Sequence, residues 1–128
     1  MNKNEIRKHI QAVRNELTED VLKEENRKIR ERLFALECFK KSTMLFSYVS
    51  FGKEADTHEI IIMALQMNKR VYVPRVENKE MNFYEIHDLD GLIRSDYGIL
   101  EPVGDIRHRY RPSSEDSKNK LMLIPGLA

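Results

Sequence analysis

The sequence predicts an α/β fold in which helices cover both faces of a mostly parallel sheet, in three layers. Short apolar segments at residues 43–49 and 71–74 have the length and composition of strands. An amphipathic segment at residues 56–68 lies between them, and strands joined by a crossover helix pair in parallel with a right-handed connection. The first strand lacks the alternation of a half-exposed strand, so both of its faces are expected to be covered.

Two amphipathic helices are predicted before the first strand. Apolar side chains in residues 4–17 recur at spacings of four, three and four, which places them on one helical stripe. Thr18 is a suitable N-cap for the second helix, whose Glu, Lys and Arg side chains are expected on a solvated face. The two stripes consist of Ile6, Ile10, Val13 and Leu17, and of Leu22, Ile29, Leu33 and Leu36.

Capping and breaking residues set the limits of the next elements. Asp56 is expected to cap the crossover helix, with Glu59 completing a capping-box pattern and the helix ending near Asn68. Pro74 is expected to end the second strand. Residues 81–86 alternate between polar and apolar side chains and predict a third strand.

The chain ends on an apolar segment that runs into Pro-Gly. Residues 121–128 predict a buried strand, and binding loops leave the carboxyl ends of strands in open α/β sheets. Residues 104–120 are polar and predict a surface loop before this strand. The 128 residues are therefore expected to form a single α/β domain that is incomplete at its carboxyl end.

The composition excludes several classes of protein. Lys and Arg number 22 against 21 Asp and Glu, and the net charge of +1 gives no general attraction to nucleic acid or membranes. The basic run at residues 107–111 is expected to face water. No segment approaches the roughly 20 apolar residues of a membrane span. The single Cys38 cannot form an internal disulfide, which indicates a cytoplasmic protein and a buried structural thiol.

Two sets of residues could bind a ligand. The cationic side chains of Lys3, Arg7 and Arg14 share a stripe beside the apolar face of the first helix. Such a stripe either binds phosphate or is simply solvated. The sequence has no phosphate-binding glycine loop, and its four histidines lack a metal-ligand spacing, so no metal ligands are expected here.

The second set lies near the ends of the predicted strands. Glu54 follows the first strand, where a carboxylate could accept hydrogen bonds from an amine-rich ligand or could simply be exposed. Met81 and Phe83 could supply adaptable apolar contact for a flat aromatic ligand, although core packing is the commoner explanation of such residues.

A series of short motifs follows along the whole chain. In order they are Lys3-x-x-x-Arg7, Tyr48 before a loop with Gly52, Glu54-Ala55-Asp56-Thr57, Lys69-Arg70-Val71-Tyr72-Val73-Pro74-Arg75, Met81-Asn82-Phe83, Tyr97-Gly98-Ile99-Leu100-Glu101-Pro102 and Ile124-Pro125-Gly126-Leu127-Ala128. This series resembles the 5-formyltetrahydrofolate cyclo-ligase family, also called methenyltetrahydrofolate synthetases. The resemblance implies the cyclo-ligase fold, which is similar to that of NagB, RpiA and CoA transferases.

The resemblance also implies an activity and a set of site residues. Members convert 5-formyltetrahydrofolate to 5,10-methenyltetrahydrofolate with ATP and Mg²⁺, releasing ADP and phosphate, and a monomer is expected. Phosphorylation makes the formyl oxygen a good leaving group, and a folate nitrogen attacks the activated carbon. By resemblance the ATP contacts are Lys3, Asn4, Glu5, Ile6 and Arg7, and the folate contacts are Val49, Glu54, Met81 and Phe83. Glu101 and Pro102 are expected to shape either the sheet edge or a pocket wall, with no chemical role.

The 128 residues lack one part of the family pattern. Family members continue with Phe-Asp, a glycine-rich stretch and a Gly-Tyr-Tyr-Asp-Arg-like segment that carries most ATP-phosphate contacts and a metal-binding acid. None of these motifs is present here, so we expect little cyclo-ligase activity from this chain alone. The alternative is a non-catalytic α/β binding module that has lost its nucleotide loop.

Overall fold

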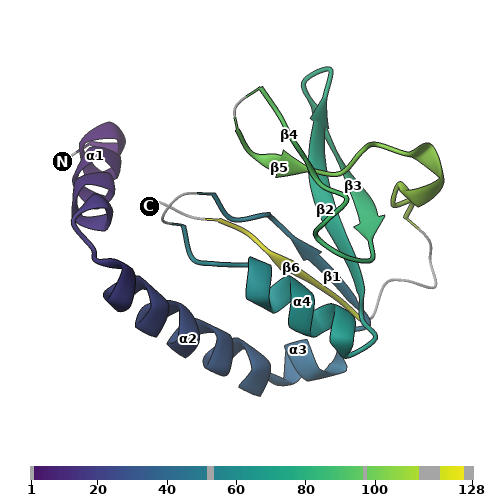
Figure 1. Ribbon diagram of the computed structural model, residues 1–128, viewed down its shortest axis with the longest axis horizontal. Helices are drawn as coiled ribbons and strands as arrows, with labels where there is room; N and C mark the ends of the chain where they lie inside the picture. Colours follow the sequence, from purple (N-terminus) through teal and green to yellow (C-terminus); the bar gives the residue numbers. More distant parts are fainter. Residues whose placement is uncertain (1, 52–53, 97, 113–118, 126–128) are drawn as a thin grey trace.

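The computed structural model describes residues 2–51, 54–96, 98–112 and 119–125, and its centre is a four-stranded sheet with the order β3-β2-β1-β6 (Figure 1). The strands are β1 (Met44–Ser47), β2 (Arg70–Glu77), β3 (Glu80–Ile86) and β6 (Lys120–Leu123). β1 pairs in parallel with β2 and β6, whereas β2 and β3 are antiparallel. The prediction of an α/β protein with a mostly parallel sheet flanked by helices is confirmed.

The remaining elements flank this sheet. The helices are α1 (Lys3–Asn15), α2 (Glu19–Ala35), α3 (Glu37–Lys41), α4 (His58–Gln66) and the 3-10 turn η1 (Ile106–His108). β4 (Ile93–Arg94) and β5 (Leu100–Glu101) form a separate antiparallel pair, which lies beside β2 (Figure 1). None of the helices in the described ranges has the length and apolarity that crossing a membrane would require.

The first two helices begin at side-chain caps. Asn2 and Glu5 form a reciprocal capping box at α1, in which Asn2 Oδ1 accepts from the Glu5 N–H at 2.8 Å. Thr18 Oγ1 accepts from the Val21 N–H at 3.3 Å, which confirms Thr18 as the cap of α2.

The expected cap of α4 is wrong by one residue. Thr57 is the N-cap, but its hydroxyl donates to the Tyr48 carbonyl at 2.8 Å and accepts from the Ser50 N–H at 2.9 Å. Asp56 Oδ1 instead accepts from the His58 N–H at 3.0 Å. The Thr57 hydroxyl therefore makes no capping bond to α4 and instead holds the loop that follows β1.

Pro74 does not end β2, contrary to the prediction. The strand continues to Glu77, and Pro74 lies opposite Phe83 in the antiparallel register with β3. The pairing of β2 with β1 extends only to Tyr72, so at Pro74 no β1 residue requires a backbone N–H. Proline is tolerated because this part of β2 has a neighbour on one side.

The two faces of the sheet are packed differently. On one face Leu45 and Val71 pack with Ile61 of α4, and each of these three side chains is fully buried. Full burial of such a side chain contributes about 1.5–3 kcal/mol. On the other face Phe46 and Tyr72 stack with ring centroids 4.9 Å apart. Phe83 and Tyr110 complete this aromatic cluster.

Two burial predictions are wrong. β6 is an edge strand in which Leu121 and Leu123 are partly buried while Met122 is half exposed, because only one of its faces packs on the core. Cys38 is exposed, since the short helix α3 buries the neighbouring Phe39 instead.

Candidate functional site

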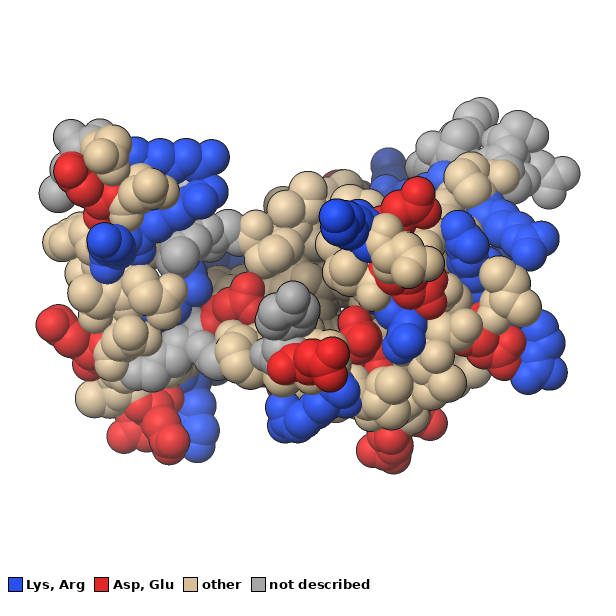
Figure 2. All heavy atoms as spheres, turned by 90° about the horizontal axis from the view of Figure 1, so that it is seen from above, with Lys and Arg blue, Asp and Glu red and all other residues tan. Residues whose placement is uncertain are grey.

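A cavity lined by described residues lies at the carboxyl ends of β1 and β2, beside the β4–β5 pair, and has a volume of about 560 Å³. Ligands bind at this end of the strands in open α/β sheets. Its apolar lining residues are Val49, Pro74, Val76, Met81, Ile93, Ile99, Leu100 and Pro125. Its charged lining residues are Glu54, Arg75, Arg94, Asp96 and Glu101. Acidic and basic side chains also lie close together across the face seen in Figure 2.

Glu54 is fixed by the loop that connects β1 to α4. Its Oε1 accepts from the Phe51 N–H at 2.8 Å, and its own N–H donates to the Phe51 carbonyl at 3.3 Å. The residue also lines an adjacent cavity of about 440 Å³, together with Arg94. Glu54 therefore stands at the boundary between the two cavities.

Tyr48 connects this loop to the cavity wall. Its hydroxyl donates to the Ala55 carbonyl at 2.9 Å. Burial raises the pKa of Tyr48 above its ordinary value, the charge of Glu54 raises that pKa further, and Arg14 acts in the opposite sense.

Arg75 is a cavity residue to which sequence reasoning gave no role. Its Nε donates to Glu77 Oε1 at 2.9 Å, and its Nη1 donates to the Pro102 carbonyl at 2.9 Å. Glu101 Oε1 lies 3.7 Å from the same Nη1, which places Glu101 in the pocket wall, one of the two positions expected for it. The position of Arg75 at the end of the motif Lys69–Arg75 could have identified it, but the strand was expected to stop at Pro74.

Arg94 was also missed. It lies in β4, lines both cavities, and donates from Nη1 to the Gly98 carbonyl at 2.9 Å. The hydrogen bond anchors the guanidinium within the β4–β5 pair. A two-residue strand gives almost no periodic signal, and no feature of the sequence identified Arg94.

The structure brings together three of the four residues expected to contact folate. Val49, Glu54 and Met81 all line the larger cavity. Phe83 lies two residues beyond Met81 and packs edge-on against Phe46, with the two ring centroids 5.4 Å apart. Phe83 is not among the lining residues, because its ring is part of the aromatic cluster.

The residues expected to contact ATP lie on α1, which stands apart from the sheet (Figure 1). None of Lys3, Asn4, Glu5, Ile6 and Arg7 lines a cavity found in the described part of the chain. Basic side chains at the α1 end extend toward the sheet side of the molecule (Figure 2). The structure thus separates the expected phosphate contacts from the expected folate contacts.

The fold and the cavity together define a class of protein. A largely apolar cavity with a few charged groups at the carboxyl ends of α/β strands is typical of a protein that binds a small molecule. The model of the 5-formyltetrahydrofolate cyclo-ligase family matches residues 1–128, and the chain belongs to this family.

Two relatives agree with this membership. The chain is 25% identical over 131 residues to a Caenorhabditis elegans protein named as a probable 5-formyltetrahydrofolate cyclo-ligase, covering 98% of this chain and 63% of that protein. It is similar to the NMR structure of Aquifex aeolicus 5,10-methenyltetrahydrofolate synthetase, with 30% identity and a TM-score of 0.83, covering 100% of this chain and 62% of that one. The chain thus spans slightly less than two thirds of the length of each relative.

Proposed function

We propose that the protein catalyses the ATP-dependent cyclisation of 5-formyltetrahydrofolate to 5,10-methenyltetrahydrofolate, with release of ADP and phosphate. The family is ATP-dependent in general. The observation that carries the proposal is the cavity at the carboxyl ends of β1 and β2, where Val49, Glu54 and Met81 converge. The family resemblance independently assigns these three positions to folate.

The cavity suits a flat, amine-rich ring. Its volume of about 560 Å³ lies within the about 300–1,000 Å³ that is usual for small-molecule sites. Val49 and Met81 would contact the faces of the ring, and Glu54 would accept hydrogen bonds from its amino groups. The backbone N–H of Phe51 uses Glu54 Oε1, so we assign the ligand contact to Oε2.

The α1 residues suit phosphate only in part. Lys3 and Arg7 are exposed cations that form no ion pair with any other described residue, so their charge is available to an anion. Glu5 is committed to the capping box, and the Ile6 N–H donates to the Asn2 carbonyl at 3.0 Å. We therefore propose Lys3 and Arg7, with the neighbouring Asn4, as the ATP contacts.

Lys3 and Arg7 would hold phosphate oxygens by charge, and Glu54 would orient the folate ring. When bound, ATP with Mg²⁺ supplies the phosphoryl group that turns the formyl oxygen into a leaving group. No ligand for this Mg²⁺ is assigned among the described residues.

We also propose a cytoplasmic monomer without nucleic-acid or membrane partners. The single cysteine and the net charge of +1 support this setting. A mass measured by light scattering that corresponds to one chain would agree with the monomer, and a dimer mass would contradict it.

The activity is tested with protein expressed from its own gene, by adding 5-formyltetrahydrofolate, ATP and Mg²⁺ and following the methenyl product by absorbance. Lys3→Met and Arg7→Met should each raise the KM for ATP about tenfold or more, because a charge-assisted contact is worth about 1.5–3 kcal/mol. Lys8→Met is the matched control, since Lys8 is also exposed on α1. No product at high enzyme concentration would overturn the proposed function.

A further inference from the structure

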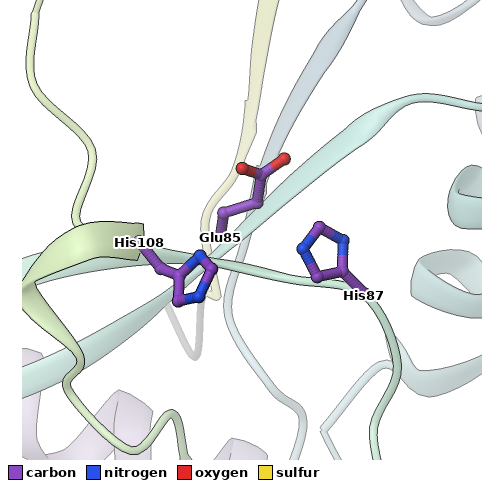
Figure 3. Close-up of side chains that lie close together, drawn as sticks. All are labelled: Glu85, His87 and His108. Carbon is purple, nitrogen blue, oxygen red and sulfur yellow. The ribbon is translucent and has the colours of Figure 1, made fainter.

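Glu85, His87 and His108 meet beside the end of β3, away from the cavity assigned to folate (Figure 3). Each side chain offers one ligand atom, and these atoms all lie within 4.8 Å of one another. Glu85 is partly buried, whereas both histidines are exposed. The cluster is composed of one carboxylate and two imidazoles, a combination that commonly binds transition metals.

Strand geometry explains why the three side chains converge. Glu85 lies near the end of β3, and His87 follows two residues later in the bend directly after the strand. An antiparallel bridge between Tyr84 and Arg109 carries the segment after η1 alongside β3. The Tyr110 N–H donates to the Phe83 carbonyl at 2.8 Å and continues this pairing. His108, one residue before the bridge, is therefore held beside Glu85.

The imidazole nitrogens are available to a ligand. No hydrogen bond to either ring is present within residues 2–51, 54–96, 98–112 and 119–125. The two rings lie edge to face, with centroids 6.0 Å apart. Because both rings are exposed, rotation about their side-chain bonds can turn a nitrogen of each toward a common point.

Glu85 is already oriented by a neighbour. Arg70 donates to Glu85 Oε2 from Nε at 3.1 Å and to Oε1 from Nη2 at 3.3 Å. Each carboxylate oxygen has a second lone pair, so these bonds leave acceptor capacity for a cation. Hydrogen bonds of this kind to ligand carboxylates are a regular feature of metal sites.

Two other cations around the cluster, Arg107 and Arg109, are engaged with other side chains. The Arg107 Nη2 lies 2.6 Å from Asp105 Oδ2, and Arg109 Nη2 donates to Asn82 Oδ1 at 2.8 Å. Asp105 also lines the small cavity next to the cluster, together with His87 and His108. The carboxylates of Glu85 and Asp105 thus offset part of the positive charge in this region.

We propose that Glu85, His87 and His108 bind one Zn²⁺ ion. Zinc accepts nitrogen and oxygen ligands at about 2.0–2.2 Å in tetrahedral geometry, which places its ligand atoms about 3.4 Å apart. The ligand atoms of the three residues now lie up to 4.8 Å apart. Rotation of the exposed histidine side chains by roughly 1 Å at the ring nitrogens would bring them to the zinc spacing. Mg²⁺ prefers an octahedron of oxygen ligands, so this site is chemically distinct from one that serves ATP.

The bound ion would fasten the segment after η1 to β3. That segment carries Tyr110, whose ring packs edge-on against two aromatic rings of the sheet. The centroid distances are 4.8 Å to Phe46 and 5.3 Å to Tyr72. Zinc binding would therefore stabilise the cover over the aromatic face of the sheet. Because the ligands come together only in the folded chain, Zn²⁺ should raise the melting temperature by mass action.

The test uses untagged protein, treated with EDTA and then titrated calorimetrically with ZnCl₂ alone. One ion should bind per chain. Loss of a residue that merely orients a metal ligand weakens metal binding about 10- to 100-fold, so His87→Gln and His108→Gln, which each remove a ligand, should weaken it by at least as much. His9→Gln, a change of an exposed histidine on α1, should leave the affinity unchanged. Absence of saturable one-to-one binding, or equal affinity in the His87→Gln/His108→Gln double variant, overturns the proposal.

Two further measurements separate metal binding from a structural role of the histidines. Co²⁺ should give a tetrahedral visible spectrum in the wild type that the double variant lacks. Without metal, the melting temperatures of the two proteins should agree within a few degrees, and Zn²⁺ should raise only that of the wild type. If the double variant does not fold, Glu85→Gln serves the same comparison, and an unchanged Co²⁺ spectrum in that variant contradicts the site.

Discussion

The β1–α4 loop and helix α1 carry the two expected halves of the active site, and the structure supports them to very different degrees. In the described part of the loop, residues 48–51 and 54–57, side chains bond repeatedly to the backbone. The Asp56 N–H also donates to Asn26 Oδ1 of α2 at 3.0 Å. Helix α1, in contrast, has no buried residue.

This difference indicates how each half can function. Groups held by several hydrogen bonds keep the geometry that orienting a ligand requires. Long cationic side chains on an exposed helix act mainly through charge, and little fixed geometry is needed for that. The proposed folate side is therefore preorganised by the described residues, whereas the α1 cations are not.

Thr57→Val should have the largest effect on stability. Thr57 is fully buried, and its hydroxyl bonds to the Tyr48 carbonyl and the Ser50 N–H. Valine keeps the shape but leaves both groups unpaired, so the free energy of unfolding should fall by about 2 kcal/mol or more. Val13→Ala on α1 should change it by no more than about 0.5 kcal/mol, because Val13 is half exposed. Urea denaturation measures both, and equal losses would abolish the contrast between the two regions.

A smaller loss is expected at the cavity wall from Gly104→Ala. Gly104 has a φ of +85°, and an added Cβ would lie 2.9 Å from Arg75 Nε. The left-handed backbone alone costs a non-glycine residue about 1–2 kcal/mol, which is the expected decrease in the free energy of unfolding. Gly91→Ala is the matched control, since the nearest atom to its added Cβ is 4.0 Å away. A decrease of the same size in both variants would show that the Arg75 wall is not tightly packed.

Charge changes around Tyr48 test whether the two regions meet. Glu54→Gln should lower the pKa of Tyr48, and Arg14→Met should raise it, because Glu54 and Arg14 act on it with opposite signs. The folded-state pKa of Tyr48 is raised, so its contribution to stability is present below about pH 10 and is lost as the pH rises through the raised value. NMR titration of the tyrosine ring measures the pKa. A pKa that does not respond to Arg14→Met would separate α1 from the loop.

The smallest effect concerns the hydrogen bonds at Glu77. Tyr84 donates to this carboxylate and is the main cause of its lowered pKa, so Tyr84→Phe should raise that pKa toward its ordinary value. Because the pKa of Glu77 is lowered in the folded state, the carboxylate stabilises the fold at pH values above the ordinary glutamate pKa of about 4.3. This stabilisation is lost as the pH falls through the lowered pKa. NMR titration of the Glu77 side-chain carbon provides the measurement. An unchanged pKa would show that Arg75, on the cavity side, controls this carboxylate.

Elements with strong periodicity could be predicted from the sequence. The apolar stripes predicted helices where α1 and α2 are found, and Thr18 correctly predicted the start of α2. The expected strand break at Pro74 failed, because the effect of a proline depends on which neighbouring strand is present. The cap at Asp56 failed because Thr57 uses its hydroxyl in a tertiary contact that local patterns do not reveal.

The candidate site also contains residues that the sequence could predict and residues that it could not. Val49, Glu54 and Met81 could be assigned because strand ends and family motifs point to them. Arg94 could not be found, because its position depends on a short strand pair. The cluster of Glu85, His87 and His108 had no recognisable spacing, since pairing between distant segments assembles it.

The most direct test of the central claim, that the β1–α4 loop forms the folate wall, is the affinity for 5-formyltetrahydrofolate measured calorimetrically without ATP. Glu54→Gln should raise the Kd about 10- to 100-fold, since a hydrogen bond to a charged group is worth about 1.5–3 kcal/mol. Glu59→Gln, a change of an exposed carboxylate on the neighbouring helix α4, should leave the Kd unchanged. An unchanged Kd in Glu54→Gln would contradict the assignment of this loop to folate.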